Sequence, residues 1–278
     1  MTQTRLNDSF PVLDRPPAER TGTPATVYSA ATIALLELCW GAGWLSPGGS
    51  EDVADLLRGQ DLRNLSVLDI GVGAGGPAIA LLTDFGARRV TGIDVEQPVL
   101  DRAAALAQAH GVAAALDLRR VSPGPLPFVD GAFDAVFSKD SFIHIADKAR
   151  LFAEIRRVLR PGALCAFGDW CCGPPPYSDA MTAWLGNGMG FATTTINEMR
   201  AELARAGFEA IEAQDCNRRF AAIAAEEAEA LAGPRRAEIV GRIGHDAAER
   251  LIATARRRAL IAIEGHLRPA HFIAKAPA

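Results

Sequence analysis

The chain has 278 residues, a formal net charge of −4 and 49% apolar residues. This is enough apolar sequence to bury a large core, either in one enlarged domain or in a domain with an inserted cap. An acidic balance gives no general attraction to nucleic acid or to anionic membranes. We therefore expect a small-molecule substrate and neither a nucleic-acid nor a membrane partner.

The first twenty residues mix charged side chains with prolines and contain no apolar stretch of signal-peptide length. We therefore expect a flexible leader over 1–24 rather than an export signal. No apolar run in the chain approaches the ~18 residues that cross a bilayer. The five cysteines are an odd number without a C-x-x-C pair, which predicts reduced thiols, no metal site and a cytoplasmic location.

Helical periodicity and short strand-like runs alternate along the chain. Helices are expected over 28–40, 51–57, 77–85, 98–110, 148–159 and 195–206. Strands are expected over 66–70, 89–94, 116–121, 133–138, 163–170, 208–213 and 271–275. This alternation predicts an α/β fold: a Rossmann-like, seven-stranded, mostly parallel sheet with helices on both faces.

More than fifty residues of helical, alanine- and arginine-rich sequence separate the last two expected strands. An insertion of this length is too long for a loop, so we expect a helical cap over the site. The predicted organisation is a leader (1–24), an N-terminal helical lid (25–60), a Rossmann-like core (61–215), the cap insertion (216–268) and a final core strand (269–278).

A glycine-rich turn follows the first expected strand, in the stretch V-L-D-I-G-V-G-A-G-G over 67–76. Glycines at this junction let a ligand approach the backbone closely. Gly71, Gly73 and Gly76 also satisfy the dinucleotide fingerprint G-x-G-x-x-G. Asp69, however, lies two residues before the first glycine, where its carboxylate would repel a pyrophosphate and attract an ammonium group.

The string Asp69-x-Gly71-x-Gly73-x-Gly75 resembles the first motif of class I S-adenosylmethionine-dependent methyltransferases. Two later stretches, Leu126-Pro127-Phe128 and V-L-R-P-G-A-L over 158–164, resemble the regions of the fourth and fifth strands of that family. The resemblance implies S-adenosyl-L-methionine as cofactor, with the acid at its methionine end and the glycines making room for it. It implies further cofactor contacts at Asp94, Val95, Ser122 and Ser138.

Asp94 ends the second expected strand, beside the first turn, where a carboxylate can accept both ribose hydroxyls. Its alternative role is to cap the helix that begins near Pro98. At the adenine end the family usually has an acidic residue where this chain has Val121-Ser122. Ser122 or the backbone is therefore expected to hold the adenine amino group.

The segment S-K-D-S-F-I-H over 138–144 follows the fourth strand and would place Asp140 and His144 on one helical face if it were helical. Such a pair could hold an amine, remove its proton or hydrogen-bond a hydroxyl nucleophile. The alternative for His144 is a satisfied core histidine.

Together with the N-terminal helical stretch from Tyr28 to Trp40, this segment resembles the phosphoethanolamine N-methyltransferases and related small-amine enzymes. The resemblance implies that Tyr28 pairs with His144 to close the site, with Asp140 beside them. Substrate contacts are expected from Trp40, Trp170 and Phe191. The arginines at 256–258 either bind an anionic group or form a solvated helix face, of which the second is the simpler expectation.

The sequence thus predicts methyl transfer to a small-molecule acceptor, most simply an amine nitrogen, by a monomer or homodimer. Three alternatives stay open: an O- or C-methyltransferase of secondary metabolism, an NAD-dependent oxidoreductase that uses the same glycines, and a non-catalytic cofactor-binding subunit. Asp69 and the lack of a convincing Tyr-x-x-x-Lys pair count against the oxidoreductase.

Overall fold

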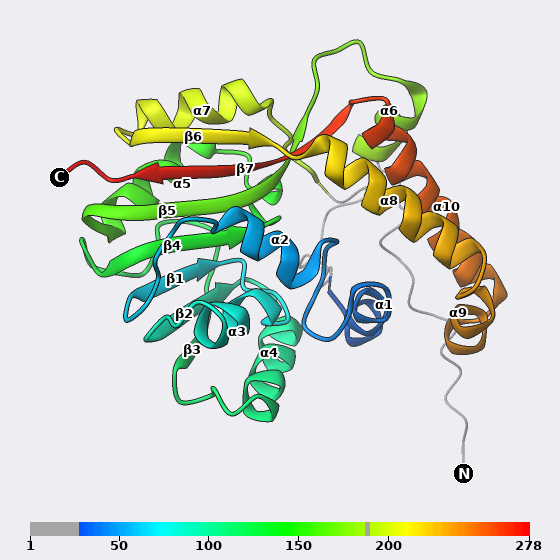
Figure 1. The fold of residues 1–278 in the computed structure, drawn as a ribbon, viewed down its shortest axis with the longest axis horizontal. Helices are drawn as coiled ribbons and strands as arrows, with labels where there is room; N and C mark the ends of the chain where they lie inside the picture. The colour runs from blue at the N-terminus through cyan, green and yellow to red at the C-terminus, as the bar shows by residue number, and fades with distance from the viewer. Residues whose placement is uncertain (1–27, 187–189) are drawn as a thin grey trace.

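The computed structural model describes residues 28–186 and 190–278. In this part of the chain a seven-stranded sheet has the order β3-β2-β1-β4-β5-β7-β6, and helices cover both of its faces (Figure 1). Strands β1 to β5 run parallel, whereas β7 runs antiparallel to both of its neighbours. The α/β, mostly parallel sheet expected from the sequence is therefore confirmed. The expected leader (1–24) lies outside the described residues.

The strands are β1 (Ser66–Ile70), β2 (Arg89–Asp94), β3 (Leu116–Arg120), β4 (Phe133–Lys139), β5 (Leu159–Cys172), β6 (Glu209–Asp215) and β7 (Leu267–Lys275). The α-helices are α1 (Ala30–Trp40), α2 (Gly49–Leu56), α3 (Gly76–Thr83), α4 (Gln97–Ala109), α5 (Lys148–Val158), α6 (Asp179–Leu185), α7 (Ile196–Arg205), α8 (Asn217–Ala232), α9 (Arg236–Ile243) and α10 (His245–Ile263).

The central strands are apolar because helices cover them on both sides. Four of the five residues of β1 are buried, and so are six of the seven residues of β4. Helix α5 shows how one amphipathic sequence fits this arrangement: the Asp147 side chain caps its first turn, and Leu151, Phe152 and Ile155 enter the core. The carboxyl ends of the parallel strands consequently meet at one edge, beside α1 and α2 (Figure 1).

Strand β5 differs from its expected bounds because it begins at Leu159 instead of 163. Pro161 cannot continue α5, and the chain turns extended at Leu159 and pairs there with Phe133 of β4. Strand β7 also begins earlier, at Leu267, because it pairs with β5 along its whole length. Helix α6 was not expected from the sequence; Ser178 caps its first turn.

Helices α8 to α10 form the insertion between β6 and β7, and α8 packs along α10 (Figure 1). This insertion reaches the N-terminal helix, since the guanidinium of Arg235 donates to the carbonyls of Leu38 and Cys39 at the end of α1. The expectation of a solvated arginine face holds for Arg256 and Arg257 but is wrong for Arg258. Its side chain is buried because it forms an ion pair with Glu227 at 2.7 Å and lies over the ring of Trp40.

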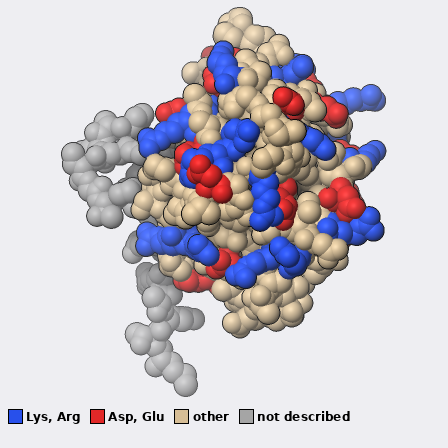
Figure 2. All heavy atoms as spheres, turned by 90° about the vertical axis from the view of Figure 1, so that its left-hand side faces the viewer, with Lys and Arg blue, Asp and Glu red and all other residues tan. Residues whose placement is uncertain are grey.

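The opposite end of the sheet, seen in Figure 2, carries basic and acidic side chains side by side. Basic and acidic side chains elsewhere in the described residues also form ion pairs, such as Arg157 with Glu154 at 2.7 Å. All five cysteines are free thiols. Of the helices in the described ranges, none combines the length and the apolar character that a membrane span requires.

Candidate functional site

An open cavity of about 640 Å³ lies at the carboxyl edge of the sheet. Its walls come from the turn after β1, the end of β2, the loop after β3, the segment after β4 and the N-terminal residues around Tyr28. Ligands of open α/β sheets bind at this edge, because the strand ends leave polar backbone groups and loops free to meet them. The cavity brings together residues that are more than a hundred positions apart in the chain.

The glycine-rich turn forms the floor of this cavity. Gly71 has a φ of 75°, and a Cβ built on it would lie 2.3 Å from the Cβ of Ser141. Gly73 has a φ of 54° and faces Leu45. Glycine is therefore required at Gly71 both by the left-handed backbone and by the close approach of the segment after β4. Gly75, the residue before α3, does not line the cavity, and a Cβ built on it would lie 2.9 Å from that of Ala103.

Asp94 lies at the end of β2 and lines the cavity. Its carboxylate accepts hydrogen bonds from the backbone N–H groups of Gly73 at 3.1 Å and of Glu96 at 3.0 Å. Burial raises the pKa of Asp94 above its ordinary value. Because a carboxylate has about four acceptor positions, further hydrogen bonds toward the cavity remain available to it. Val95 lines the cavity next to it.

Asp69 lies behind the glycine turn and is only 1% exposed. Neither of its carboxylate oxygens has a hydrogen-bond partner among the described residues. Burial, together with the nearby Asp94 carboxylate, raises the pKa of Asp69 to about 8. An unpaired buried carboxylate is costly, and a cation brought to the turn would relieve that cost.

The two expected serine contacts lie in different places. Ser122 lines the cavity with its neighbours in the loop after β3. Ser138 is fully buried within β4 and donates to the carbonyl of Ile70 at 2.7 Å, so it does not line the cavity. Ser141 takes that place: it lines the cavity and donates to the same carbonyl at 2.8 Å.

The segment after β4 is not the helix that would put Asp140 and His144 on one face. Asp140 has a φ of 54°, and only Phe142–His144 form a single 3-10 turn. The left-handed conformation at Asp140 ends the strand sharply, and its N–H donates to the carbonyl of Gly168. Both side chains nevertheless line the cavity, as does Tyr28.

Tyr28 and His144 differ in their surroundings. Burial and the carboxylates of Asp94 and Glu96 raise the pKa of Tyr28 to about 12, so its phenol keeps its proton at neutral pH. His144 is exposed to the cavity, and its ring centroid lies 5.4 Å from that of Phe191. The site thus combines a hydroxyl donor, an imidazole and a carboxylate.

The aromatic residues expected to touch substrate lie outside the large cavity. Trp40 packs beside Arg258, and its indole nitrogen is buried. Trp170 and Phe191 both stack on Trp184, at centroid distances of 6.0 Å and 4.6 Å. Trp170 lines a second, smaller pocket that adjoins the first.

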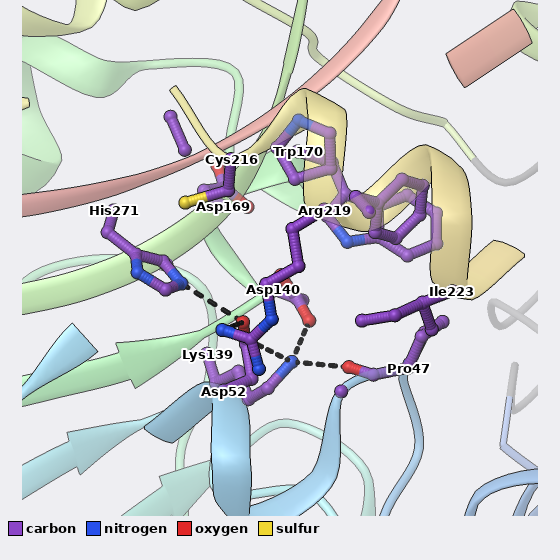
Figure 3. A pocket seen from close by; sticks show the side chains of 15 residues that line it. Pro47, Asp52, Lys139, Asp140, Asp169, Trp170, Cys216, Arg219, Ile223 and His271 are labelled. Atoms are coloured by element: carbon purple, nitrogen blue, oxygen red, sulfur yellow. Dashed lines mark hydrogen bonds and ion pairs between the residues drawn. The ribbon is translucent and has the colours of Figure 1, made fainter. Parts of the chain in front are cut away.

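The second pocket holds about 20 Å³ and is rich in charged side chains (Figure 3). Lys139 and Asp140 line both cavities, so the two meet at the end of β4. Sequence reasoning missed Lys139, Asp52 and His271 in this cluster. Sequence reasoning could have found Lys139, because it lies between Ser138 and Asp140, which were both predicted site residues. Asp52 and His271 gave no local signal, since they are far apart in the chain and come together only through β7.

No cluster of His, Cys, Asp and Glu side chains within 28–186 and 190–278 is arranged to hold a metal ion. The large cavity is lined instead by glycine backbone, a phenol, an imidazole, two cationic side chains and five carboxylates, those of Asp94, Glu96, Asp140, Asp147 and Glu154. Such a set can bind an organic molecule with hydroxyl and ammonium groups, and it can move a proton.

Comparison with known proteins identifies a methyltransferase domain over residues 68–167. Phosphoethanolamine N-methyltransferase 3 of Arabidopsis thaliana is 27% identical over 205 residues, which are 73% of this chain and 41% of that protein. The chain thus spans less than half the length of that curated relative.

Two solved structures show the same fold. Phosphoethanolamine N-methyltransferase 2 of Haemonchus contortus, in complex with phosphomonomethylethanolamine and S-adenosylhomocysteine, superposes with a TM-score of 0.85 at 24% identity, covering 91% of this chain and 59% of its own. A Galdieria sulphuraria protein described as a sarcosine dimethylglycine methyltransferase has a TM-score of 0.78 at 18% identity, covering 89% of this chain and 98% of its own. The chain therefore contains a methyltransferase domain, has the fold of these two structures and is similar in sequence to the phosphoethanolamine N-methyltransferases.

Proposed function

We propose that the protein transfers a methyl group from S-adenosylmethionine to a small amine and releases S-adenosylhomocysteine. The observation that carries the proposal is the single cavity that joins the glycine turn and Asp94 to Tyr28, Asp140 and His144. A cofactor site alone would fit many proteins. The same cavity also presents groups able to bind and deprotonate an acceptor, which a purely cofactor-binding subunit does not need.

The residues of the turn fit this cofactor. Asp69 is a buried carboxylate without a partner, and the α-ammonium of the methionine end would satisfy it. Gly71 and Gly73 leave backbone exposed where any side chain would fill the floor. Asp94 and Val95 would hold the ribose, and Ser122 with the neighbouring backbone would hold the adenine. Ser138, which is enclosed in β4, would act on the cofactor only through the carbonyl of Ile70.

When bound, S-adenosylmethionine supplies a sulfonium methyl group to the acceptor. The protein's own task is to align the acceptor, keep it neutral and exclude water. Asp140 would bind the acceptor as an ammonium, and His144 would take its proton. Tyr28, whose phenol stays protonated, would donate a hydrogen bond beside His144 and close the cavity from the N-terminal side.

Deprotonation is the costly part of this chemistry. An amine with a pKa near ~10 costs about 4 kcal/mol to present as the free base at pH 7. Partial desolvation in the cavity lowers that cost, because a buried ammonium loses its hydration, and a nearby imidazole accepts the proton. Charge therefore favours an amine acceptor: a carboxylate that binds an ammonium would repel the oxyanion of a deprotonated phenol.

We propose also that residues 25–60 act as a lid and 216–268 as a cap over the core (61–215), with 269–278 completing the sheet. The contacts of Arg235 with the end of α1, and of Arg258 with Trp40, support a cap that fixes the lid. Trp40, Trp170 and Phe191 would then shape the acceptor end of the site from behind the cavity wall, instead of contacting the acceptor directly.

Calorimetry with S-adenosylhomocysteine and with NAD tests the cofactor. We expect the native protein to bind S-adenosylhomocysteine and Asp94→Asn to lose this binding. The matched control Asp101→Asn should bind as the native protein does, because Asp101 is exposed on α4. Binding of NAD in place of S-adenosylhomocysteine would refute the proposal.

A methyl-labelled donor then identifies the acceptor. The panel contains phosphoethanolamine, phosphomonomethylethanolamine, sarcosine, dimethylglycine, ethanolamine and simple phenols. We expect the label on nitrogen. Label on oxygen or carbon would show that the acceptor is a hydroxyl or an enol instead of an amine. If no compound is labelled although the cofactor binds tightly, the protein is better explained as a cofactor-binding subunit.

A further inference from the structure

The Lys139 side chain is buried at the carboxyl end of β4, between the two cavities, and is only 4% exposed. Its ammonium group contacts four oxygens: Ser46 Oγ at 3.1 Å, the Pro47 carbonyl at 3.0 Å, Asp52 Oδ2 at 3.2 Å and Asp140 Oδ2 at 2.5 Å. Figure 3 shows Lys139 among Pro47, Asp52 and Asp140. Lys139 thus uses all of its hydrogen-bonding capacity inside the protein.

This arrangement keeps the ammonium charged. Burial alone would lower the pKa of Lys139, but the carboxylates of Asp140 and Asp52 outweigh it and raise the pKa above its ordinary value. An uncompensated buried ammonium would be strongly destabilising, so the two carboxylates and the lysine depend on one another.

The four contacts belong to parts of the chain that are otherwise separate. Ser46 and Pro47 lie in the loop between α1 and α2, and Ser46 also forms part of the large cavity's wall. Asp52 lies on α2, and Asp140 lies in the segment after β4. Through one side chain, the N-terminal wall of the cavity is fixed to the carboxylate that faces its interior.

A second layer of contacts holds Asp52 in place. His271 of β7 lies 3.2 Å from Asp52 Oδ1, and Arg219 of α8 lies 3.9 Å from the same oxygen (Figure 3). Burial by itself would lower the pKa of His271 and raise that of Asp52. The pairing between them outweighs burial, so the pKa of His271 rises to about 9 and that of Asp52 falls to about 2. At neutral pH both are charged, so Asp52 presents a fixed carboxylate to Lys139.

The backbone of Asp140 is in the left-handed region, at a φ of 54°, and therefore depends on contacts such as the ion pair with Lys139. A non-glycine residue there is strained and persists only when neighbouring contacts fix it. Two contacts fix Asp140: its N–H donates a hydrogen bond to the carbonyl of Gly168 at 2.8 Å, and its carboxylate forms the ion pair with Lys139.

We infer that Lys139 is a positioning residue that ties the loop between α1 and α2 to Asp140, so that the cavity wall and the acceptor-binding carboxylate are set in place together. The role given to Asp140 rests on the proposed function. The tie itself is a property of the free protein and can be tested without any acceptor.

Hydrogen exchange followed by mass spectrometry measures the tie in two peptides, one covering 42–49 and one covering 139–144. In Lys139→Met we expect exchange to speed up by about tenfold in both peptides, because the loop and Asp140 lose their common anchor. Lys139→Arg should restore most of the protection, since a guanidinium can reach the same oxygens. The peptide covering β1 serves as the internal reference and should not change.

Unchanged exchange in either peptide of a folded Lys139→Met would overturn the inference, and so would an equal speeding up of the β1 peptide, which would indicate general destabilisation. If Lys139→Met does not fold, Ser46→Ala removes one contact of the ammonium without leaving a charge unpaired. Ser46→Ala should speed exchange in 42–49 severalfold. The control Ser50→Ala, at an exposed position nearby, should leave exchange in 42–49 unchanged. Equal exchange in the two serine variants would also overturn the inference.

A kinetic measurement separates this inference from the proposed function. With an acceptor from the labelled-donor panel, Lys139→Met should raise KM about tenfold or more, while Lys139→Arg recovers it. If no acceptor is methylated, the proposed function fails, yet the exchange result still decides whether Lys139 holds the loop and Asp140.

Discussion

The residues around the glycine turn illustrate how burial changes the chemistry of a side chain. Asp69 and Asp94 are both carboxylates at strand ends, but Asp94 accepts two backbone hydrogen bonds while Asp69 accepts none. Burial therefore acts on Asp69 with little opposition, and its pKa rises to about 8. At pH 7 such a group is largely protonated until a cation arrives.

This difference predicts a pH dependence of cofactor binding. S-adenosylhomocysteine carries the same ammonium as the methyl donor, and in the proposed function this ammonium would bind the ionised form of Asp69. Below pH 8 the proton must leave on binding, so affinity should weaken as the pH falls, by up to about tenfold per pH unit. Calorimetry in buffers of different ionisation enthalpy should also detect about one released proton at pH 6 and 7, and about half a proton at pH 8. Asp69→Asn should remove the proton release, and a pH-independent affinity in the native protein would contradict the role of Asp69.

His144 provides the second prediction at this scale. Because it faces the cavity beside Tyr28 and Asp140, its replacement should affect proton removal and not cofactor binding. We expect His144→Ala to lower kcat by about 10²-fold or more, with the affinity for S-adenosylhomocysteine changed by less than about threefold. His110→Ala, at an exposed position at the end of α4, is the matched control. Unchanged turnover in His144→Ala would remove this residue from the mechanism.

At the scale of elements, the turn after β1 and the segment after β4 depend on each other. Ser138 and Ser141 both donate to the carbonyl of Ile70, and Ser141 occupies the space where Gly71 would carry a Cβ. A glycine in this turn is thus needed for the fit between two loops as well as for ligand access. This dependence also explains why the segment after β4 turns sharply instead of continuing as a helix.

Gly71→Ala should therefore cost more than a glycine substitution elsewhere. Gly111→Ala is the matched control, because Gly111 has a φ of 71° but nothing within 4 Å of an added Cβ. Both variants share the left-handed strain of about 1–2 kcal/mol, which corresponds to a few degrees in Tm. Only Gly71→Ala adds a clash with Ser141, so its Tm should fall clearly further and its binding of S-adenosylhomocysteine should be lost. If Gly71→Ala and Gly111→Ala have equal Tm values in thermal denaturation, the segment that contains Ser141 moves away from the added Cβ without cost.

At the scale of the whole molecule, the site and the insertion are joined by buried charges. Lys139, Asp52 and His271 connect β4, α2 and β7. The ion pair of Arg258 with Glu227 connects α10 to α8 next to the ring of Trp40. Each group stabilises the fold only in one protonation state, so the stability of the free protein depends on pH.

The direction of that dependence follows from three groups whose pKa values are raised in the folded protein. Asp169 is a buried residue of β5 whose carboxylate accepts a hydrogen bond from the N–H of Ile143 at 3.1 Å. Burial raises the pKa of Asp69 from 3.8 to about 8 and the pKa of Asp169 from 3.8 to about 7, while the pairing with Asp52 raises the pKa of His271 from 6.5 to about 9. Between pH 4 and pH 9 the folded state therefore binds more protons than the unfolded state, and stability falls as the pH rises.

Thermal denaturation should show this as a Tm that falls by roughly 5 °C or more between pH 5.5 and pH 8.5. Asp69→Asn should flatten the profile, because its side chain cannot ionise, and saturating S-adenosylhomocysteine should flatten it too. The surface substitution Asp84→Asn is the control and should leave the slope unchanged. A Tm that rises with pH over this range would contradict these protonation states.

The sequence by itself determined the seven strands and their succession along the chain with all the helices before α6, the methyltransferase domain and the residues of the glycine turn. These features are local: an apolar run of period two, a helix of period 3.6, or glycines at a strand end follow from nearest neighbours along the chain. The sheet and the methyltransferase domain are confirmed. The role of each site residue stays a prediction, because no ligand contact tests it.

Tertiary structure alone decided which side chains meet. It enclosed Ser138 in β4 and placed Ser141 at the cavity, it moved Trp40, Trp170 and Phe191 behind the wall, and it buried Arg258. It also brought Lys139, Asp52 and His271 together across more than two hundred residues of chain. Such contacts depend on sheet order and on the packing of the insertion, and the energy of a buried charge depends on partners that no local pattern specifies.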